Sequence, residues 1–551
     1  MLTYELRLGI TGHRNLRDEL EVGHAIHRLL DRINDTLNHQ HVTPLSWTVV
    51  SALASGADRL FAERVLEDRR GRLEVVTPFP VSEYIKDFDP GTDRGQFDRL
   101  LARASQLDQL AGDRESARDA AYLRAGEHVV DTCEIVVAVW DGRPSSGGGT
   151  GDVVEYAVRR ERIVIWIDAD SPDAPPRVVR SVAYDAGGRL AAGSWTDFPG
   201  TAKELSRGYH RQARYCLDPA VPPAIISDRL SLRRDTLLGA ARAAGLDPNM
   251  LLPLLGEAVQ QYVRADALAQ YYQRRHNLAV GGVLYLAAAA VTVAVGQVLF
   301  FPDRPWLIVF EIVAMMLVFA LWQWGRREAW HEKWLHDRYL AERLRAAIFT
   351  PLVGAQSKHA KPNDPLPFYR GPRHWLAQAA EVLTRSVPVV AIPFEPLRGF
   401  IVSQWLEDQR NHHAGGAVRK ARSAHRRHLL GFGLFGVTFL MAGLHLAGVG
   451  HPHGMPGQDW LRIDLWISFL AIVLPAWAGA VHAATSQLEL ERLAQRSEQM
   501  ARALDRLVHR AERARSIEEL REVCRYAAEL MADENHEWWV LLSFQRLRLH
   551  V

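Results

Sequence analysis

Three short glycine-containing segments carry the residues of this 551-residue chain that are best suited to bind an anion. They are Gly12, His13 and Arg14; then Ser55, Gly56, Ala57 and Asp58; then Gly147, Gly148, Gly149 and Thr150. Glycine lets backbone approach a ligand closely, helix N-termini offer unpaired N–H groups to phosphate, and an arginine can fork onto phosphate oxygens. Together the segments predict a site for a phosphorylated, nucleotide-like ligand. Ordinary turn glycines are the alternative for each segment taken singly.

Each of these segments follows a short apolar run that is typical of a strand. Such runs lie at 5–10, 47–51, 73–77, 134–140 and 163–167, and helical stretches separate them. Strands this apolar, alternating with helices, predict an α/β Rossmann-like domain whose parallel sheet is covered on both faces. Ligands bind at the carboxyl edge of such sheets, so we expect the three segments to converge there.

The second half of the chain contains four long apolar stretches, at 277–301, 306–325, 429–450 and 465–484. A helix of about 20 apolar residues crosses a bilayer core. The short link at 302–305 allows only an antiparallel hairpin, and 451–464 can make a second one. The pattern therefore predicts an all-α membrane domain with four transmembrane helices in two hairpins. Core helices of a large soluble protein are the alternative.

Lysine and arginine residues predict how these hairpins are oriented. Five basic residues precede the third stretch, whereas the two hairpin tips hold only Arg304 and Arg462. Basic residues concentrate on the cytoplasmic side of membrane proteins. We therefore expect a multi-pass protein of the inner (plasma) membrane, with cytoplasmic N- and C-termini and no cleaved signal peptide.

The predicted organisation has six parts. They are a nucleotide-binding domain (1–220), a helical connector running into the first span (221–276), a first hairpin with a cytoplasmic helix that continues its second span (277–349), a linker with juxtamembrane helices (350–428), a second hairpin (429–484) and C-terminal cytoplasmic helices (485–551).

Composition narrows the range of partners. The 66 Lys and Arg residues nearly balance 64 Asp and Glu residues, which argues against a binder of nucleic acid polymers. The three cysteines lie far apart without CxxC spacing and predict reduced thiols rather than a zinc site. His451 and His453 at a hairpin tip are more typical of a polar loop than of a metal site. We expect no metal and no cofactor besides the nucleotide-derived ligand.

The motifs ITGHRNL, SALASGADRLFAERVL, VVTPFPVSEYIKDF and VVAVWDGRPSSGGGTGDVVEYA resemble the SLOG superfamily of Rossmann-like nucleotide-binding domains. This superfamily includes the Lonely guy phosphoribohydrolases, the DNA-processing protein and the N-terminal domains of melastatin-type TRP channels. The resemblance implies that backbone at Gly12 faces the ligand beside His13 and Arg14, and that residues 55–58 form a second wall. It further implies that residues 147–150 cradle phosphate and that Asp141 lies near the sugar.

The hairpins with their flanking helices resemble SLATT modules, more closely at the second hairpin, which SQWLEDQRNHHAGGAVRKARSAHRRH precedes and NHEWWVLLSFQRL follows. In bacteria such modules accompany SLOG domains in conflict and antiphage systems. The two resemblances imply a nucleotide-signal-sensing membrane effector, acting as a homo-oligomer that opens a pore or disrupts the bilayer. A transporter is disfavoured, because no inverted repeat with broken helices is evident.

The chain departs from the hydrolytic members of this superfamily at one position. Their GGxGTxxE pattern places a carboxylate three residues after the threonine, where this chain has Val153. Asp152 and Glu155 lie about 100° and 200° away around a helix. Acid–base catalysis needs the carboxylate within reach of the bond. A membrane-tethered nucleoside-phosphate or NAD N-glycosidic hydrolase, using Glu155 or Asp152, is therefore the alternative function.

Overall fold

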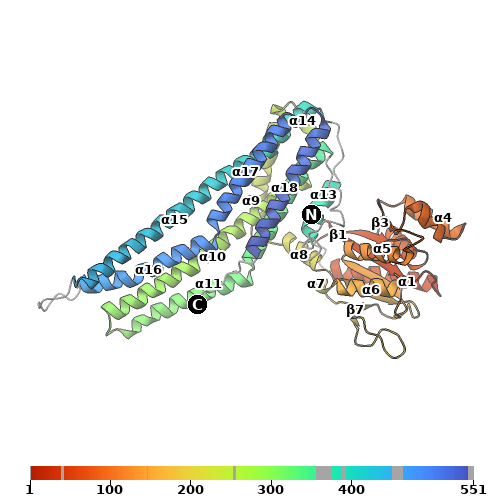
Figure 1. Cartoon of the computed structure of the whole chain (residues 1–551), viewed down its shortest axis with the longest axis horizontal. Coiled ribbons are helices and arrows are strands. Elements are labelled where there is room, and N and C mark those ends of the chain that lie inside the picture. The colour runs from red at the N-terminus through yellow and green to blue at the C-terminus, as the bar shows by residue number, and fades with distance from the viewer. Residues whose placement is uncertain are drawn as a thin grey trace. The chain divides into compact units, whose positions relative to one another are not determined.

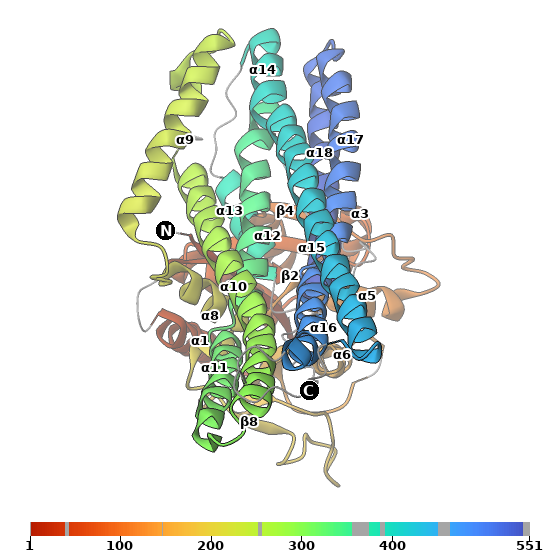
Figure 2. The ribbon, with the colours of Figure 1, turned by 90° about the vertical axis from the view of Figure 1, so that its left-hand side faces the viewer.

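The computed structural model describes residues 2–38, 43–145, 147–251, 256–354, 374–385, 392–449 and 463–543. The chain divides into two compact units (Figures 1 and 2). The first lies within Met1–Asp218 and Ser357–Leu383, and the second within Pro219–Gln356 and Thr384–Val551.

The first unit is an α/β domain built on one eight-stranded sheet, with strand order β4-β3-β2-β1-β5-β6-β7-β8. The strands are β1 (Tyr4–Gly12), β2 (Leu45–Ser51), β3 (Arg72–Thr77), β4 (Gln106–Gln109), β5 (Ile135–Trp140), β6 (Ile163–Asp168), β7 (Arg177–Val179) and β8 (Trp195–Asp197). The predicted α/β class is confirmed. The sheet is mixed rather than wholly parallel, because β7 and β8 add to one edge as antiparallel strands.

Helices cover both faces of this sheet, as predicted. Successive residues of a strand point to opposite faces. A Cβ on Gly9 would lie 2.8 Å from Val129 of one helix, whereas a Cβ on Gly12 would lie 2.5 Å from Ala57 of another. The helices of this unit are α1 (Glu19–Asn38), α2 (Ala57–Asp68), α3 (Val81–Tyr84), α4 (Thr92–Ala102), α5 (Arg118–Thr132), α6 (Thr150–Arg159), α7 (Ala202–Leu205), α8 (Arg207–Cys216) and part of α13 (His374–Arg385).

The strand order changes side between β1 and β5, which are parallel neighbours at the middle of the sheet. From β1 the chain proceeds to β2, β3 and β4 on one side, and from β5 it proceeds to β6 on the other. The loops after β1 and β5 therefore diverge. In open α/β sheets such a switch point is where ligands bind.

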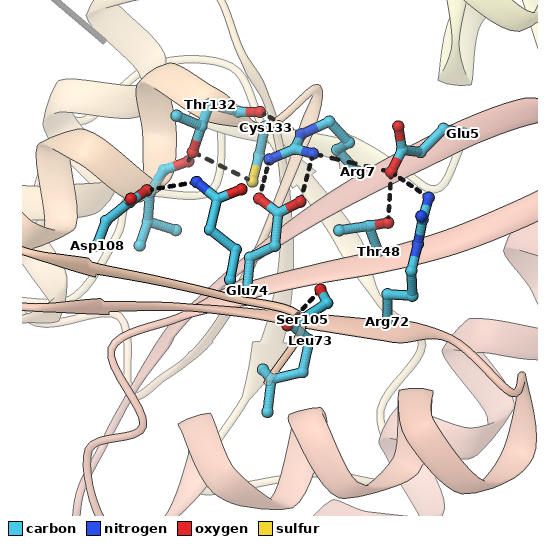
Figure 3. A network of polar contacts seen from close by, with 12 residues as sticks. Glu5, Arg7, Thr48, Arg72, Leu73, Glu74, Ser105, Asp108, Thr132 and Cys133 are labelled. Carbon is cyan, nitrogen blue, oxygen red and sulfur yellow. Dashed lines mark hydrogen bonds and ion pairs between the residues drawn. The ribbon is translucent and has the colours of Figure 1, made fainter. Parts of the chain in front are cut away.

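A buried ionic network lies at the opposite, amino edge of the strands (Figure 3). Arg7 of β1 donates two hydrogen bonds to Glu74 of β3, at 3.0 and 2.5 Å, and its Nε donates to Thr132 O at 2.9 Å. Glu5 accepts hydrogen bonds from Thr48 and Arg72, both at 2.8 Å. Burial alone would lower the pKa of Arg7, but the Glu74 carboxylate raises it. The network joins three strands and the end of α5.

The second unit is all-helical, within the ranges described. Its helices are α9 (Pro223–Ala243), α10 (Glu257–Phe300), α11 (Ile308–Arg327), α12 (Trp330–Phe349), α14 (Phe394–Ile401), a π-helical turn η6 (Val402–Glu407), α15 (Asp408–Leu446), α16 (Ile463–Gln487), α17 (Leu490–Glu512) and α18 (Ile517–Ser543). Residues from most of them form one apolar core around Phe349, Trp405 and Leu504.

Four helical segments of this unit are long and apolar enough to cross a membrane, as predicted. In the segments that contain α11 and α15, no residue of the most apolar 18-residue window is buried. Phe432 and Phe439 are 75% and 77% exposed. Soluble proteins rarely expose apolar surfaces this large, so the chain is a membrane protein.

The helix predicted to continue the second span through 326–349 is interrupted. Ala329 has φ 51°, in the left-handed region, and separates α11 from α12. The connector also differs from the prediction, because α9 is a separate helix and only α10 runs unbroken into the first span. Gly245, with φ 79°, follows the end of α9.

The two halves of the membrane unit repeat one arrangement. In the first half α11 pairs with α10, and the next helix, α12, also lies alongside α10 (Figure 2). In the second half α15 pairs with α16, and α17 returns alongside α15 after a break at Glu489, with φ 46°. The halves meet along α10 and α16, where Trp477 Nε1 donates to Thr292 Oγ1 at 2.9 Å.

Candidate ligand site at the carboxyl edge of the sheet

The loops after β1 and β2 pack directly on each other. The backbone N–H of Ala57 donates to His13 O at 3.1 Å. Gly56 has φ 83°, and a Cβ there would lie 2.2 Å from Arg14 O. A Cβ on Gly12 would lie 2.9 Å from Val139 O. Packing between loops therefore requires glycine at both positions, whether or not a ligand approaches them.

His13 and Asp141 meet across the switch point, as their positions after β1 and β5 predict. His13 Nε2 lies 3.0 Å from the Asp141 backbone nitrogen and 3.2 Å from its Oδ1. A neutral His13 accepts from the N–H, and a protonated one would pair with the carboxylate. Arg189 Nε donates to Asp141 O at 3.1 Å and braces the loop from its other side.

Asp58 lies under the loop rather than on its surface, with 5% of the residue exposed. Its carboxylate accepts from Ser51 Oγ at 3.3 Å, and Ser51 Oγ in turn accepts from the Leu53 N–H at 2.9 Å. Burial raises the pKa of Asp58 to about 7, although hydrogen bonds and the charges of Arg14 and Arg59 oppose this. The residue therefore changes charge near neutral pH.

The raised pKa of Asp58 predicts that stability falls as pH rises. Between about pH 4 and 7 the folded state holds a proton on Asp58 that the unfolded state releases. The free energy of unfolding of the first unit therefore falls by up to about 4 kcal/mol as the pH rises across this window. Hydrogen exchange in the full chain measures the opening free energy of α2. We expect its downward slope with rising pH to disappear in Asp58→Asn. The exposed Asp98→Asn should retain the slope. An unchanged slope in Asp58→Asn would contradict the prediction.

Further residues, not named as candidate ligand contacts, lie in the same region: Arg59 and Tyr84 beside the Asp58 carboxylate, Asp93 against Arg59, and Tyr122 against Arg14. Arg59 is wholly buried, and its Nη1 donates to Asp93 O and Oδ1 at 2.7 and 2.5 Å. Ser55 Oγ donates to the same Asp93 carboxylate at 2.9 Å. Arg59 Nη2 and the hydroxyl of buried Tyr84 have no hydrogen-bond partner among the described residues. Arg14 stacks over Tyr122 at 5.0 Å.

The glycine-rich loop after β5 packs on the first turns of α5. Gly147 and Gly148 have φ 73° and 82°. A Cβ on Gly148 would lie 2.6 Å from Leu123 N. Asp152 Oδ2 accepts from the Gly148 N–H at 2.9 Å, so this carboxylate already binds one of the N–H groups offered to a phosphate. Thr150 begins α6.

The segments containing Arg14 and Gly148 share a support, because both contact α5. The structure thus brings together His13, Arg14, Asp58 and Asp141, and it attaches residues 147–150 to the same helix that carries Tyr122. Whether a ligand occupies this edge of the sheet stays a prediction.

The carboxylates considered for catalysis are engaged in other contacts. Glu155 is exposed and pairs with Arg159 at 2.8 Å, while Asp152 closes the glycine loop. Val153 is buried, and a Cβ on Gly126 of α5 would lie 2.4 Å from its Cγ2. The position that bears the acid in the hydrolytic pattern is therefore filled here by core packing.

No cluster of three metal-ligating side chains occurs in the part of the chain that the structure describes. His451 and His453 lie outside the described residues. Cys133, Cys216 and Cys524 form no disulfide, and burial raises the pKa of the Cys133 thiol to about 12.

Comparison with known proteins adds no assignment to this geometry. No protein-family model matches the chain, and no curated protein has a significantly similar sequence.

Proposed function

We propose that this chain is a nucleotide-signal-sensing membrane effector of the inner membrane. The first unit binds a nucleotide-derived ligand, and binding controls the four-helix module, which opens a pore or disrupts the bilayer as a homo-oligomer. The observation that best supports this is the grouping of Arg14, His13, Asp141 and buried Asp58 at a switch point of the sheet. The resemblance to SLOG and SLATT modules points to bacterial antiphage defence as the setting.

Coupling between ligand and membrane requires differential affinity: the ligand must bind the active arrangement more tightly than the resting one. A chain continuity supports such coupling, because α10 extends unbroken from Glu257, ahead of the apolar stretch, to Phe300 at the far end of the first span. A rotation or shift of its first turns is thereby carried into the bilayer.

Dye release from proteoliposomes tests the proposal. We expect one member of a panel of cyclic dinucleotides, ADP-ribose variants and NAD to accelerate release from vesicles containing the full chain. Arg14→Gln should lower the affinity for that ligand about 30-fold, which is the loss expected when one charge-assisted hydrogen-bond pair is removed. Arg17→Gln is the matched control, because Arg17 is 83% exposed and pairs with Asp170.

Calorimetry with the same panel separates the outcomes. Absence of binding to every nucleotide would overturn the proposal. Chromatographic detection of released base, abolished in Glu155→Gln, would instead support the hydrolase alternative.

The proposed orientation is tested by cysteine labelling in a Cys216→Ser background. Asp303→Cys, in the exposed turn between the first two spans, should react with a membrane-impermeant maleimide added to intact cells. Arg513→Cys, an exposed position after α17, should react only after lysis. The reverse pattern would place the hairpin tips in the cytoplasm.

A further inference from the structure

The face of α15 that precedes its apolar stretch carries a group of basic side chains around one cavity. This shallow hollow, called the arginine cavity, is open to its surroundings, has a volume of about 450 Å³ and is lined by Arg419, Arg422, Ser423, Arg426 and Arg427. These positions recur at steps of three and four residues and so share one face of the helix.

Basic residues on the adjoining face of α15 are used differently, because each has a partner on α17. The pairs are Arg410 with Asp505 at 3.2 Å, Lys420 with Ser497 at 2.9 Å and His428 with Glu491 at 2.8 Å. Within the described ranges, the four arginines of the cavity form no hydrogen bond or ion pair. Nη1 of Arg427 is buried without a partner.

This arrangement favours a bound anion. Four like charges repel one another, and a buried guanidinium N–H without an acceptor loses its hydration without replacement. Arginine forks bind phosphate through two parallel N–H···O bonds, which a chloride ion cannot reproduce. An oxyanion such as phosphate therefore suits these side chains better than chloride does.

The position along the helix indicates where that phosphate comes from. The apolar stretch begins at Leu429, and Leu429, Leu430 and Phe432 are 59%, 54% and 75% exposed. At 1.5 Å per residue, the cavity lies about 3 to 15 Å along the helix from the start of this stretch. Lipid headgroups occupy about 5 to 8 Å on each side of a bilayer core, so Arg426 and Arg427 lie within the headgroup layer and Arg419 and Arg422 lie just outside it. Basic groups just outside a span attract anionic lipids.

We propose that the arginine cavity binds the phosphate of an anionic lipid headgroup. Arg422 and Arg426 supply exposed forks, and Arg427 supplies the buried donor. The site lies wholly on α15, so it does not depend on the proposed nucleotide function. Bound lipid holds the start of the third span at a fixed depth in the leaflet.

The test uses the full chain in a neutral detergent, titrated with short-chain phosphatidylglycerol and, as a control, phosphatidylcholine. We expect saturable binding of the first lipid only. Arg422→Gln/Arg426→Gln should weaken it about 10- to 30-fold, given the contribution of each basic group at a membrane surface. Arg502→Gln/Arg525→Gln removes the same charge from exposed positions on α17 and α18 and should change affinity less than twofold.

Two further arms keep the outcome interpretable. Arg422→Lys/Arg426→Lys preserves charge but not the fork, and we expect it to lose affinity as well; undiminished binding would reduce the site to a general basic surface and overturn the proposal. Inorganic phosphate and AMP should compete poorly with the lipid. Equal competition would assign the cavity to a soluble anion, and binding that survives both double variants would place the lipid elsewhere.

Discussion

Arg7→Met should lower the opening free energy of β1 by about 3–5 kcal/mol, because it leaves the Glu74 carboxylate buried without its bidentate partner. Both residues are less than a tenth exposed, so water cannot replace the lost contacts. The same substitution frees Thr132 O at the end of α5. Hydrogen exchange of peptides from residues 4–12 in the full chain measures the effect where it arises.

A double substitution separates pairing from packing. Replacing a buried ion pair by apolar residues of similar volume is often neutral, so Arg7→Met/Glu74→Leu should recover most of the stability lost by Arg7→Met. Arg28→Met breaks a surface pair with Glu21 at 3.4 Å and should cost less than about 1 kcal/mol. If Arg7→Met behaved like Arg28→Met, the buried network would have no structural role.

Gly56→Ala should disrupt the candidate ligand site, with a loss of stability about as large as that expected for Arg7→Met. The new Cβ would lie 2.2 Å from Arg14 O and 2.6 Å from His13 O, both backbone atoms, and the residue has φ 83°. Backbone strain of about 1–3 kcal/mol therefore adds to an overpacking cost of similar size. We expect reduced stability near residues 12–14 and loss of any nucleotide binding that the unsubstituted protein shows.

Gly91→Ala is a matched control for this effect. Gly91 also precedes a helix and has nearly the same backbone conformation as Gly56, with φ 103° and ψ −121° against 83° and −123°. A Cβ on Gly91 meets nothing within 4 Å. The control therefore reports strain alone. Equal losses in the two variants would mean that the contact between the loops is unimportant.

The parts of the fold that could be predicted are those with strong local signals. The strand 135–140 is wholly apolar and wholly buried, and the spans are long apolar runs in which Glu311 is the one carboxylate, so both are visible in the sequence. The edge strand β4 has the polar sequence QLDQ, and β7 and β8 are three residues each. Pairing with neighbours, rather than any local pattern, makes these segments strands.

The candidate site was predicted in outline for the same reason. Glycines before helices mark the loops after β1, β2 and β5, and topology brings those loops to one edge. Arg59, Tyr84 and Asp93 come from α2, α3 and α4, and only tertiary packing joins them to Ser55 and Asp58. The break at Ala329 was missed because alanine in a left-handed conformation has no sequence signature.

The same order of helix pairing occurs twice in the membrane unit of each polypeptide. Two three-helix modules of different sequence, one from α10 to α12 and one from α15 to α17, are joined covalently. A ring of such chains would contain twice as many modules as subunits. The contacts between neighbouring modules would then alternate between two kinds: contacts within one chain, such as that of α10 with α16, and contacts between chains. The contact within a chain would stay formed, whereas the contact between chains would be able to separate.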